Sequence, residues 1–344
     1  MLSVSDYAAA LTRGAPLMDL RSPAEFQRGA FPGAVNLPLL TDAERERVGI
    51  RYKHGGQDAA IELGSNLVSG EVKAARLAAW QAIADGNPDA MLYCWRGGLR
   101  SETVQAWLAD TGRHVPRIDG GYRALRRFCI DTLDRNREWL VVGGRTGVGK
   151  TDIVKRIPGS IDLEALANHR GSAFGKRATS QPTPISFENA LAVQLLMRDS
   201  RPAPVVVEDE SRTIGRLAIP ESVYRGMQSA PIVLVELEQS TRIENIYREY
   251  VVEADDRESL QESLETSLDN IRRRLGGARH GEVLARMRGA FEGGDADAHR
   301  AWIGMLLDWY YDPLYDYQIG RKRDRIVFQG NADAVCDHLR GSNR

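Results

Sequence analysis

One short segment combines the groups that nucleophilic chemistry needs. Residues 93–101 read YCWRGGLRS. Cys94 ends a short apolar run, and a pattern that predicts a helix begins at Ser101. The loop between the two carries the candidate catalytic residues Cys94, Arg96 and Arg100, together with the candidate ligand-binding residues Gly97 and Gly98.

This loop is expected to bind an anion. The N-terminus of a helix has backbone N–H groups without acceptors and the positive end of the helix dipole. Gly97 and Gly98 allow backbone bends that turn several N–H groups to one side, and the two arginines add full charges. Such surroundings favour a nucleophilic thiolate. The alternative interpretation is a buried structural cysteine beside a surface Gly-Arg turn.

A second segment has the spacing of a phosphate-binding loop. Residues 144–151 read GRTGVGKT, after an apolar run at 140–142 and before a helical pattern from Asp152, and they match G-x-x-x-x-G-K-[ST]. Backbone N–H groups of such a loop surround a diphosphate, its lysine reaches the outer oxygens, and its final hydroxyl can bind Mg²⁺. The predicted binding residues are Gly144, Thr146, Gly147, Gly149, Lys150 and Thr151, with Thr151 the candidate metal ligand. The motif specifies a diphosphate and no base, so ATP, GTP or a prenyl diphosphate could each occupy it.

An acidic turn further along the chain completes this second site. Residues 204–211 read PVVVEDES, an apolar run followed by acids, as in the strand that supplies carboxylates to P-loop proteins. Glu208 and Asp209 are therefore predicted to belong to the cofactor site. The alternative is a buried strand that ends in a solvated acidic turn.

Alternating apolar runs and amphipathic segments must position these residues. Strands are predicted at 15–20, 90–93 and 115–118, with a helix at 72–84; a second series of strands follows at 139–142, 204–207 and 231–237. Residues 122–138 predict a connecting helix. Beyond Ser240 the pattern is mostly helical to about 311, followed by a strand at 325–328 and a helix from Asn331. Strands separated by helices predict parallel sheets covered on both faces, and thus the α/β class.

Length and composition limit the class of protein. A chain of 344 residues predicts two domains, here 1–130 and 131–344. The net charge of −1 means that contact with nucleic acid must come from local patches. Three distant cysteines form neither a disulfide framework nor a metal motif, and Cys129 and Cys336 are expected to be inert core thiols. No signal peptide or membrane span is expected, so we predict a cytoplasmic chain without a membrane partner.

Three motifs within the first 125 residues resemble those of the rhodanese family of sulfurtransferases: DLRSPAEF at 19–26, GAFPGAVNLP at 29–38 and DGGY at 119–122. The resemblance implies a rhodanese-like parallel sheet with helices on both faces, and a Cys94 that carries a chalcogen atom as a persulfide. Five residues separate Cys94 from Arg100, one more than in the common rhodanese loop. That spacing is similar to the CX5R loop of cysteine phosphatases and would suit a phosphate-derived donor or an atom larger than sulfur.

A rhodanese-like domain followed by a P-loop is an uncommon combination, and further segments indicate a more specific family. The loop at 94–101 and the segments DLEALANHRGSAFG at 162–175, QPTPISFEN at 181–189 and VEDESRTIG at 207–215 resemble the tRNA 2-selenouridine synthase family. The likeness runs nearly end to end and is weakest after about residue 255. It implies a C-terminal P-loop NTPase-like α/β domain with additional helices.

The resemblance to this family also implies a reaction. The sulfur of 2-thiouridine at the tRNA wobble position is first geranylated with geranyl diphosphate, and selenium from selenophosphate then replaces the S-geranyl group to give 2-selenouridine. In this scheme Cys94 takes selenium from selenophosphate, and the P-loop binds the diphosphate of the prenyl donor, with Mg²⁺ as a candidate cofactor. The implied partner is tRNA, and an enzyme that produces selenophosphate is a candidate second partner.

Several further segments are open to two interpretations. Asn168, His169, Arg170 and Ser172 could hold a phosphate or an anticodon base, or cap their own loop. Three basic clusters are candidate RNA contacts or simply solvated faces: Arg123, Arg126 and Arg127; residues 271–280; and residues 321–323. The aromatic-rich stretch 302–317 could stack bases, but its helical spacing favours packing.

Other classes of protein remain as alternatives. The first is a generic rhodanese-type sulfurtransferase gated by a nucleotide-binding P-loop domain. The second is a P-loop kinase or nucleotide-gated binding module that uses a degenerate rhodanese domain for docking. The CX5R spacing also admits a phosphatase or an arsenate reductase, although Trp95 and the sulfurtransferase-like motifs argue against both.

Overall fold

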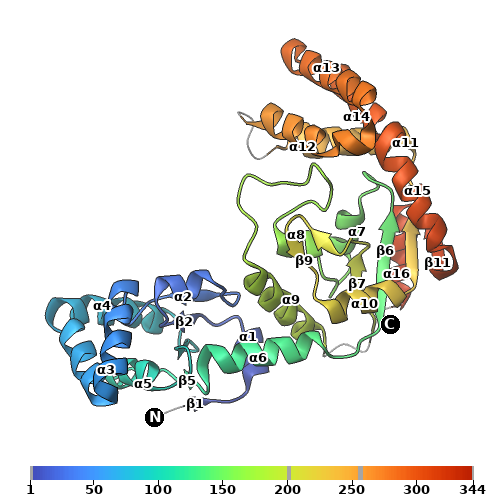
Figure 1. Cartoon of the computed structure of the whole chain (residues 1–344). Helices are drawn as coiled ribbons and strands as arrows, with labels where there is room; N and C mark the ends of the chain where they lie inside the picture. The colour runs from blue at the N-terminus through green and yellow to red at the C-terminus, as the bar shows by residue number, and fades with distance from the viewer. Residues whose placement is uncertain (1–2, 200–202, 255–258, 343–344) are drawn as a thin grey trace. The chain divides into compact units, whose positions relative to one another are not determined.

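Two compact units make up the chain in the computed structural model, which describes residues 3–199, 203–254 and 259–342 (Figure 1). The first unit comprises Met1–Asp134 and Thr183–Met197, and the second comprises Arg135–Pro182 and Arg198–Arg344. Each unit contains a parallel sheet with helices, so the predicted α/β class is confirmed.

The first unit is built on a five-stranded parallel sheet with the order β1-β5-β4-β2-β3. Its strands are β1 (Ser3–Val4), β2 (Leu17–Asp19), β3 (Ala34–Asn36), β4 (Met91–Tyr93) and β5 (Arg117–Ile118). Its helices are α1 (Tyr7–Thr12), α2 (Pro23–Gln27), α3 (Asp42–Leu67), α4 (Gly70–Gly86), α5 (Leu99–Ala109), α6 (Gly121–Leu133) and α9 (Pro184–Arg198). Buried Met18, Leu92, Trp80 and Leu108 share one core. The central strand β4 therefore carries Cys94 to the carboxyl edge of the sheet.

Helix α9 is distant in sequence from the rest of its unit. It lies between the P-loop and the acidic strand in the chain, yet Asn189 is completely buried against the first unit. The Asn189 Nδ2 donates to the Ala30 carbonyl (3.0 Å), and its Oδ1 accepts from Arg126 Nη1 (2.9 Å). Arg126 also pairs with Glu188. The contacts of Asn189 and Glu188 with Ala30 and Arg126 thus fix α9. Nothing in the helical pattern indicated them.

The second unit is built on a parallel sheet with the order β11-β10-β6-β7. Its strands are β6 (Trp139–Gly144), β7 (Val205–Glu208), β10 (Ile232–Val235) and β11 (Ile326–Gly330), and β8 (Thr213–Ile214) pairs with β9 (Leu217–Ala218) in a separate hairpin. Helices α7 (Lys150–Arg156), α8 (Leu163–Ala167), α10 (Glu221–Ser229) and α16 (Ala332–Ser342) accompany this sheet. Because β6 lies between β10 and β7, the P-loop that follows it starts at the centre of the sheet.

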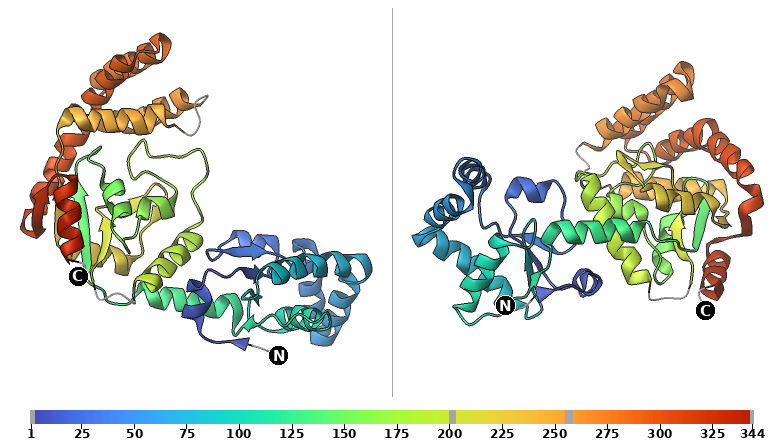
Figure 2. Two further views of the ribbon diagram at one scale, coloured as in Figure 1. Left: turned by 180° about the vertical axis from the view of Figure 1, so that it is seen from behind. Right: turned by 60° about the horizontal axis from the view of Figure 1, so that its bottom comes forward.

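Most of the chain beyond residue 238 forms helices, as predicted (Figure 2, orange to red). They are α11 (Gln239–Tyr247), η1 (Arg248–Val252), α12 (Leu260–Leu275), α13 (Gly277–Gly293), α14 (Ala296–Leu306), η2 (Leu307–Tyr311), α15 (Asp312–Arg321) and η3 (Arg323–Arg325). Trp302 and Tyr311 are buried in their common core, so these aromatic residues pack as expected, whereas Tyr317 is exposed. Within the described residues, no helix has the length and apolar character that a membrane span requires.

The contacts of α9 give a first prediction. Asn189→Ala leaves the Ala30 carbonyl and Arg126 without their buried partner, which should cost about 1–3 kcal/mol. Amide hydrogen exchange of residues 184–198 in the full chain should then accelerate by roughly 5- to 150-fold. Asn66→Ala, at an exposed position of α3, is the matched control and should change nothing. Equal exchange in both variants would show that α9 does not depend on this contact.

Candidate active site

The Cys94 loop has the predicted position between a strand and a helix. Cys94 follows β4 and is 3% exposed, and α5 begins at Leu99. The Cys94 Sγ lies 3.4 Å from the hydroxyl oxygen of buried Ser101. Among the described residues, no acceptor receives the backbone N–H groups of residues 96–100. An anion that reached this loop would find donors already in place.

The segment at residues 117–122 holds the loop from outside. Tyr122 N–H donates to the Cys94 carbonyl (2.9 Å), and Arg117 Nη1 donates to the Gly97 carbonyl (2.6 Å). Gly97 and Gly121 both have positive φ, and a Cβ on Gly121 would lie 2.2 Å from the Cys94 carbonyl oxygen. Only glycine allows this close approach of two backbones.

The two arginines of the loop have different surroundings. Arg100 Nη1 lies 2.8 Å from Glu25 Oε2, whereas Arg96 is exposed and has no carboxylate partner in the described part of the chain. Burial opposes the ionisation of Glu25, but the hydrogen bond and charge of Arg100, with Ser22 and Arg45, outweigh it and lower the pKa of Glu25. Arg100 is therefore already neutralised by a carboxylate, and Arg96 is the cation that is open to a ligand.

The P-loop has the backbone of a diphosphate cradle. Gly144, Gly147 and Gly149 all have positive φ, and a Cβ on Gly147 would lie 2.8 Å from the Arg242 carbonyl oxygen. The N–H groups of residues 146–150 have no acceptor among the residues that the structure describes. Lys150 Nζ rests on the carbonyl of Gly144 (2.9 Å), at the edge of the same loop. The sequence motif thus forms the expected set of donors.

Helix α11 orients this loop. Buried Arg242 donates from Nε to the Thr146 carbonyl (2.8 Å), and its Nη2 pairs with Asp312 of α15 (2.5 Å). Asn245 Nδ2 donates to the Gly147 carbonyl (2.9 Å). Because the peptide unit is planar and trans, carbonyls held toward α11 direct the following N–H groups to the opposite side. None of these three anchoring residues was identified from the sequence.

A pair of carboxyl groups lies beside the P-loop. Thr151 Oγ1 donates to Glu164 Oε2 (3.0 Å), and the Glu164 carboxyl lies close enough to Glu210 to raise its pKa. Burial and then the charge of Glu164 raise the pKa of Glu210 to about 8, although Lys150 opposes this shift. Glu164 and Glu210 were missed as site residues because their partners come from separate segments.

These groups fit a magnesium ion that is shared with a ligand. Mg²⁺ typically takes one or two carboxylates and completes its shell with water and substrate phosphates. A divalent cation could offset the charges of the Glu164 and Glu210 carboxyls, and the Thr151 hydroxyl is hydrogen-bonded to Glu164. In the described residues no group of three or more His, Cys, Asp or Glu side chains is placed to hold a metal, so phosphate oxygens would have to contribute.

The two acids predicted from the sequence have other contacts. Glu208 is completely buried, and its Oε2 accepts from the Leu163 N–H (3.2 Å). Burial, followed by the charges of Asp162 and Glu164, raises the pKa of Glu208 well above its ordinary range. Asp209 lines the P-loop cavity, but Lys322 Nζ lies 2.7 Å from both of its oxygens. Glu210 is the acid of this turn that lies beside Thr151 and Glu164.

Two cavities meet at the P-loop. The P-loop cavity has a volume of about 650 Å³ and is lined by Lys150, Thr151, Glu164, Glu210 and residues of α11, η1 and α15. A smaller cavity of about 30 Å³ has an apolar lining that includes Phe174, Leu264, Trp302, Ile303, Leu306 and Leu307. Both cavities share Thr146, Ser172, Ile246 and Tyr250 as walls. A phosphate cradle and an apolar pocket are therefore neighbours.

Some of the remaining candidate residues form ion pairs within the protein or are buried, and others are exposed at the surface. Arg126 and Lys322 form ion pairs with Glu188 and Asp209, and Arg127 pairs with Asp131. Arg123, Arg272, Arg273 and Arg274 are exposed. Cys129 and Cys336 are fully buried, as predicted, and burial raises the pKa of the Cys129 thiol to about 12.

Comparison with known proteins identifies the class and then the family. A rhodanese-like domain model matches residues 3–127, and a model of the tRNA 2-selenouridine synthase AAA domain matches residues 137–344. The fold and the two loops thus define a rhodanese-like domain fused to a P-loop domain.

Curated relatives give the family. A tRNA 2-selenouridine synthase of Bordetella bronchiseptica is 49% identical over 98% of this chain and 98% of its own length. Those of Hahella chejuensis and Pseudomonas fluorescens are 47% and 48% identical over 98% of this chain, and over 94% and 98% of their own lengths. The chain belongs to the tRNA 2-selenouridine synthase family. The predicted family, and with it the prediction of an enzyme of the transferase class, is confirmed.

The anchoring of the P-loop gives a second prediction. Arg242→Met removes the donor that holds the Thr146 carbonyl and leaves Asp312 unpaired, so pyrophosphate binding measured by calorimetry should weaken at least about tenfold. Asn245→Ala, a milder change on the same loop, should weaken binding less. Circular dichroism would verify that each variant folds.

A matched control removes a surface ion pair of the same helix. Arg300→Met breaks the pair with Glu244 of α11 (2.7 Å), which is exposed and should leave pyrophosphate affinity unchanged. If Arg242→Met and Asn245→Ala both bound pyrophosphate like the unaltered protein, the anchoring by α11 would be irrelevant to the cradle.

Proposed function

We propose that this enzyme converts 2-thiouridine of tRNA into 2-selenouridine through an S-geranyl intermediate, with geranyl diphosphate and selenophosphate as co-substrates in the cytoplasm. The observation that carries the proposal is the apolar pocket that adjoins the phosphate cradle. A prenyl diphosphate matches this arrangement, because it consists of a diphosphate group joined to a hydrocarbon chain. The base and ribose of a nucleotide would not make use of this apolar lining, because they require polar partners.

The hydrocarbon end of the donor is assigned to the apolar pocket. Its lining side chains come from α12, α14 and η2, and Ile246 and Tyr250 are the hydrophobic residues that it shares with the P-loop cavity. The present volume of about 30 Å³ is far smaller than a prenyl chain, so binding must displace side chains. Burial of the chain would be favourable by about 0.8 kcal/mol for each CH₂ group.

Prenyl transfer requires stabilisation of a departing diphosphate. The sulfur of the thiouridine attacks the first carbon of the prenyl chain: a C–S bond forms, the C–O bond to the diphosphate breaks, and the diphosphate leaves with the electron pair. The ring nitrogen N3 releases its proton. Lys150 and the free N–H groups of residues 146–150 stabilise the charge of the leaving group. Mg²⁺, held by Thr151, Glu164 and Glu210, would supply further positive charge when bound.

The Cys94 loop is assigned to the selenium donor. Selenophosphate contains selenium bonded to phosphorus(V), so release without an oxidant requires that selenium keep the bonding electrons. Attack of Cys94 Sγ on phosphorus achieves this, because an S–P bond forms, the P–Se bond breaks, and selenide leaves. Water then cleaves the S–P bond to give phosphate and the thiol. Selenide adds at C2 of the S-geranyl base, and geranylthiol is expelled.

Ser101 and Arg96 support this assignment. The Ser101 hydroxyl lies within hydrogen-bonding distance of Cys94 Sγ, where it can stabilise the sulfur as its S–P bond breaks. Exposed Arg96 and the unpaired N–H groups of the loop can bind the phosphate oxygens. A perselenide on Cys94, by contrast, would leave the phosphorus reduced.

The two loops should be separable by mutation. Lys150→Ala should reduce formation of S-geranyl nucleoside at least about 100-fold, because the leaving diphosphate loses its cation. Cys94→Ala should still geranylate but form no 2-selenouridine. Mass spectrometry of nucleosides from 2-thiouridine tRNA incubated with both donors measures each product. The reverse pattern, or selenium incorporation by a Cys94→Ser variant, would contradict the proposal.

The site of attack by Cys94 can be tested with a labelled donor. Selenophosphate that carries radioactive phosphorus should label Cys94 transiently on rapid acid quench, and Cys94→Ser should remain unlabelled. Ser101→Ala should lengthen the lifetime of the labelled cysteine, because the sulfur is a poorer leaving group without its hydrogen bond. Selenium on Cys94 without phosphorus would show that the family's persulfide chemistry applies instead.

A further inference from the structure

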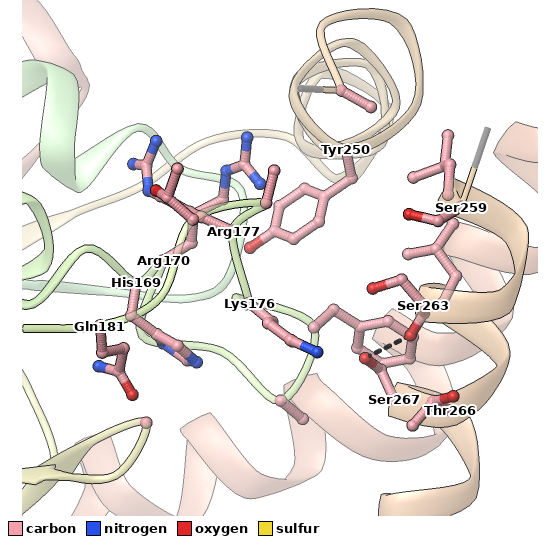
Figure 3. A pocket seen from close by; sticks show the side chains of 18 of the residues that line it. His169, Arg170, Lys176, Arg177, Gln181, Tyr250, Ser259, Ser263, Thr266 and Ser267 are labelled. Atoms are coloured by element: carbon pink, nitrogen blue, oxygen red, sulfur yellow. Dashed lines mark hydrogen bonds between the residues drawn. The ribbon is translucent and has the colours of Figure 1, made fainter. Parts of the chain in front are cut away.

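A third cavity of the second unit lies next to the P-loop cavity and is unlike it in chemistry. Its volume is about 650 Å³, within the range of about 300–1,000 Å³ that ligand pockets occupy. In Figure 3, Lys176 of the loop that follows α8 points toward Ser263 and Ser267 of α12, whereas Arg170 and Arg177 lie on the other side of Tyr250. We call this cavity, between residues 168–181 and α12, the polar pocket.

The loop side of the polar pocket is cationic. In the part of the chain that the structure describes, its lining contains four cations, Arg170, Lys176, Arg177 and Arg216, against one carboxylate, Glu262. Among the described residues, no carboxylate pairs with Lys176, Arg177 or Arg216, and the buried Nε of Arg177 has no acceptor. Burial and then the charges of Arg177 and Arg170 lower the pKa of His169, so its ring adds no positive charge at neutral pH. These unpaired cations indicate an anionic ligand.

The helix side of the polar pocket is mostly uncharged and polar, and Glu262 is its one carboxylate among the described residues. Ser263, Thr266, Ser267 and Asn270 of α12 line it. The Ser267 hydroxyl donates to the Ser263 carbonyl (2.8 Å), while no partner of the Thr266 hydroxyl or the Asn270 amide occurs in the described residues. Hydroxyl and amide groups can both donate and accept, as the edge of a pyrimidine requires. A phosphate alone would not need this wall.

Three residues separate the polar pocket from the P-loop cavity. Arg170, Arg177 and Tyr250 line both. Tyr250 lies in the π-helical segment η1, its hydroxyl is 2.9 Å from that of Ser172, and Arg170 lies over its ring (5.2 Å). Tyr250 also lines the apolar pocket, so a diphosphate cradle, an apolar pocket and the polar pocket all meet at this side chain.

We infer that the polar pocket binds the target nucleotide of the tRNA during prenyl transfer. Its backbone phosphate contacts Lys176, Arg177 and Arg216, and its pyrimidine lies between Tyr250 and the polar face of α12. The sulfur then faces the wall that the P-loop cavity shares, which brings it to the first carbon of the prenyl donor. This inference rests on the proposed function for the identity of the neighbouring ligand.

A photochemical experiment tests the placement without requiring catalysis. An anticodon stem-loop with thiouridine at the wobble position is irradiated with the full-length protein, and the cross-linked peptides are mapped by mass spectrometry. Cross-links to residues 168–181, Tyr250 or 259–270 support the inference. Efficient cross-linking that occurs only at other segments overturns it.

Steady-state kinetics can show whether the polar pocket binds tRNA or the prenyl donor. Lys176→Gln and Asn270→Ala, which line only the polar pocket, should each raise the KM for tRNA about tenfold and leave the KM for geranyl diphosphate unchanged. Lys176→Gln should also reduce the slope of log affinity against log salt by about 1. Lys53→Gln, at an exposed position of α3, is the matched control and should behave like the unaltered protein.

The two proposals can fail separately. If the unaltered protein makes no S-geranyl nucleoside but cross-links within the polar pocket, the nucleotide site stands and the proposed reaction does not. If geranylation proceeds and Lys176→Gln and Asn270→Ala both keep a normal KM for tRNA, the nucleotide site is wrong and the reaction stands.

Discussion

The buried guanidinium of Arg242 is the constraint on which the second unit depends. It holds the Thr146 carbonyl with one nitrogen and Asp312 with the others, and thereby joins the P-loop to α11 and α15. An arginine is buried in this way only when its donors are satisfied, because an unpaired charge in the interior is costly. The same contact that turns the loop's N–H groups to one side therefore also fixes α11, which continues into η1 and its Tyr250.

The Cys94 loop and the P-loop present backbone N–H groups to an anion in the same physical way. Within the described residues, each leaves several backbone N–H groups without acceptors. Each is also held by its carbonyls from outside, through Arg242 and Asn245 in one case and through Arg117 and Tyr122 in the other. They differ in their compensating charges. Glu25 neutralises Arg100 beside Cys94, whereas the paired carboxyls of Glu164 and Glu210 leave the P-loop cavity suited to a cation as well as an anion.

Much of the fold and part of the site could be predicted from local patterns. The strands at β2, β4, β6, β7 and β10 coincide with the apolar runs, and both glycine-rich loops follow a strand and precede a helix. The acidic turn after β7 was identified, but which of its three acids lies beside Thr151 was not. Glu208 points into the interior and Asp209 is paired with Lys322, 113 residues away, so Glu210 remains for the site.

The sequence by itself determined the two loops, because their donors are backbone N–H groups that glycines and a following helix arrange within a few residues. It also determined the family, through motifs of contiguous residues. Only the tertiary structure decided what surrounds each loop: Arg242 and Asp312 behind the P-loop, Glu164 beside Glu210, helix α9 on the first unit, and three cavities that meet at Tyr250. These contacts join segments far apart in the chain, and the packing that brings them together leaves no periodicity or spacing in the sequence.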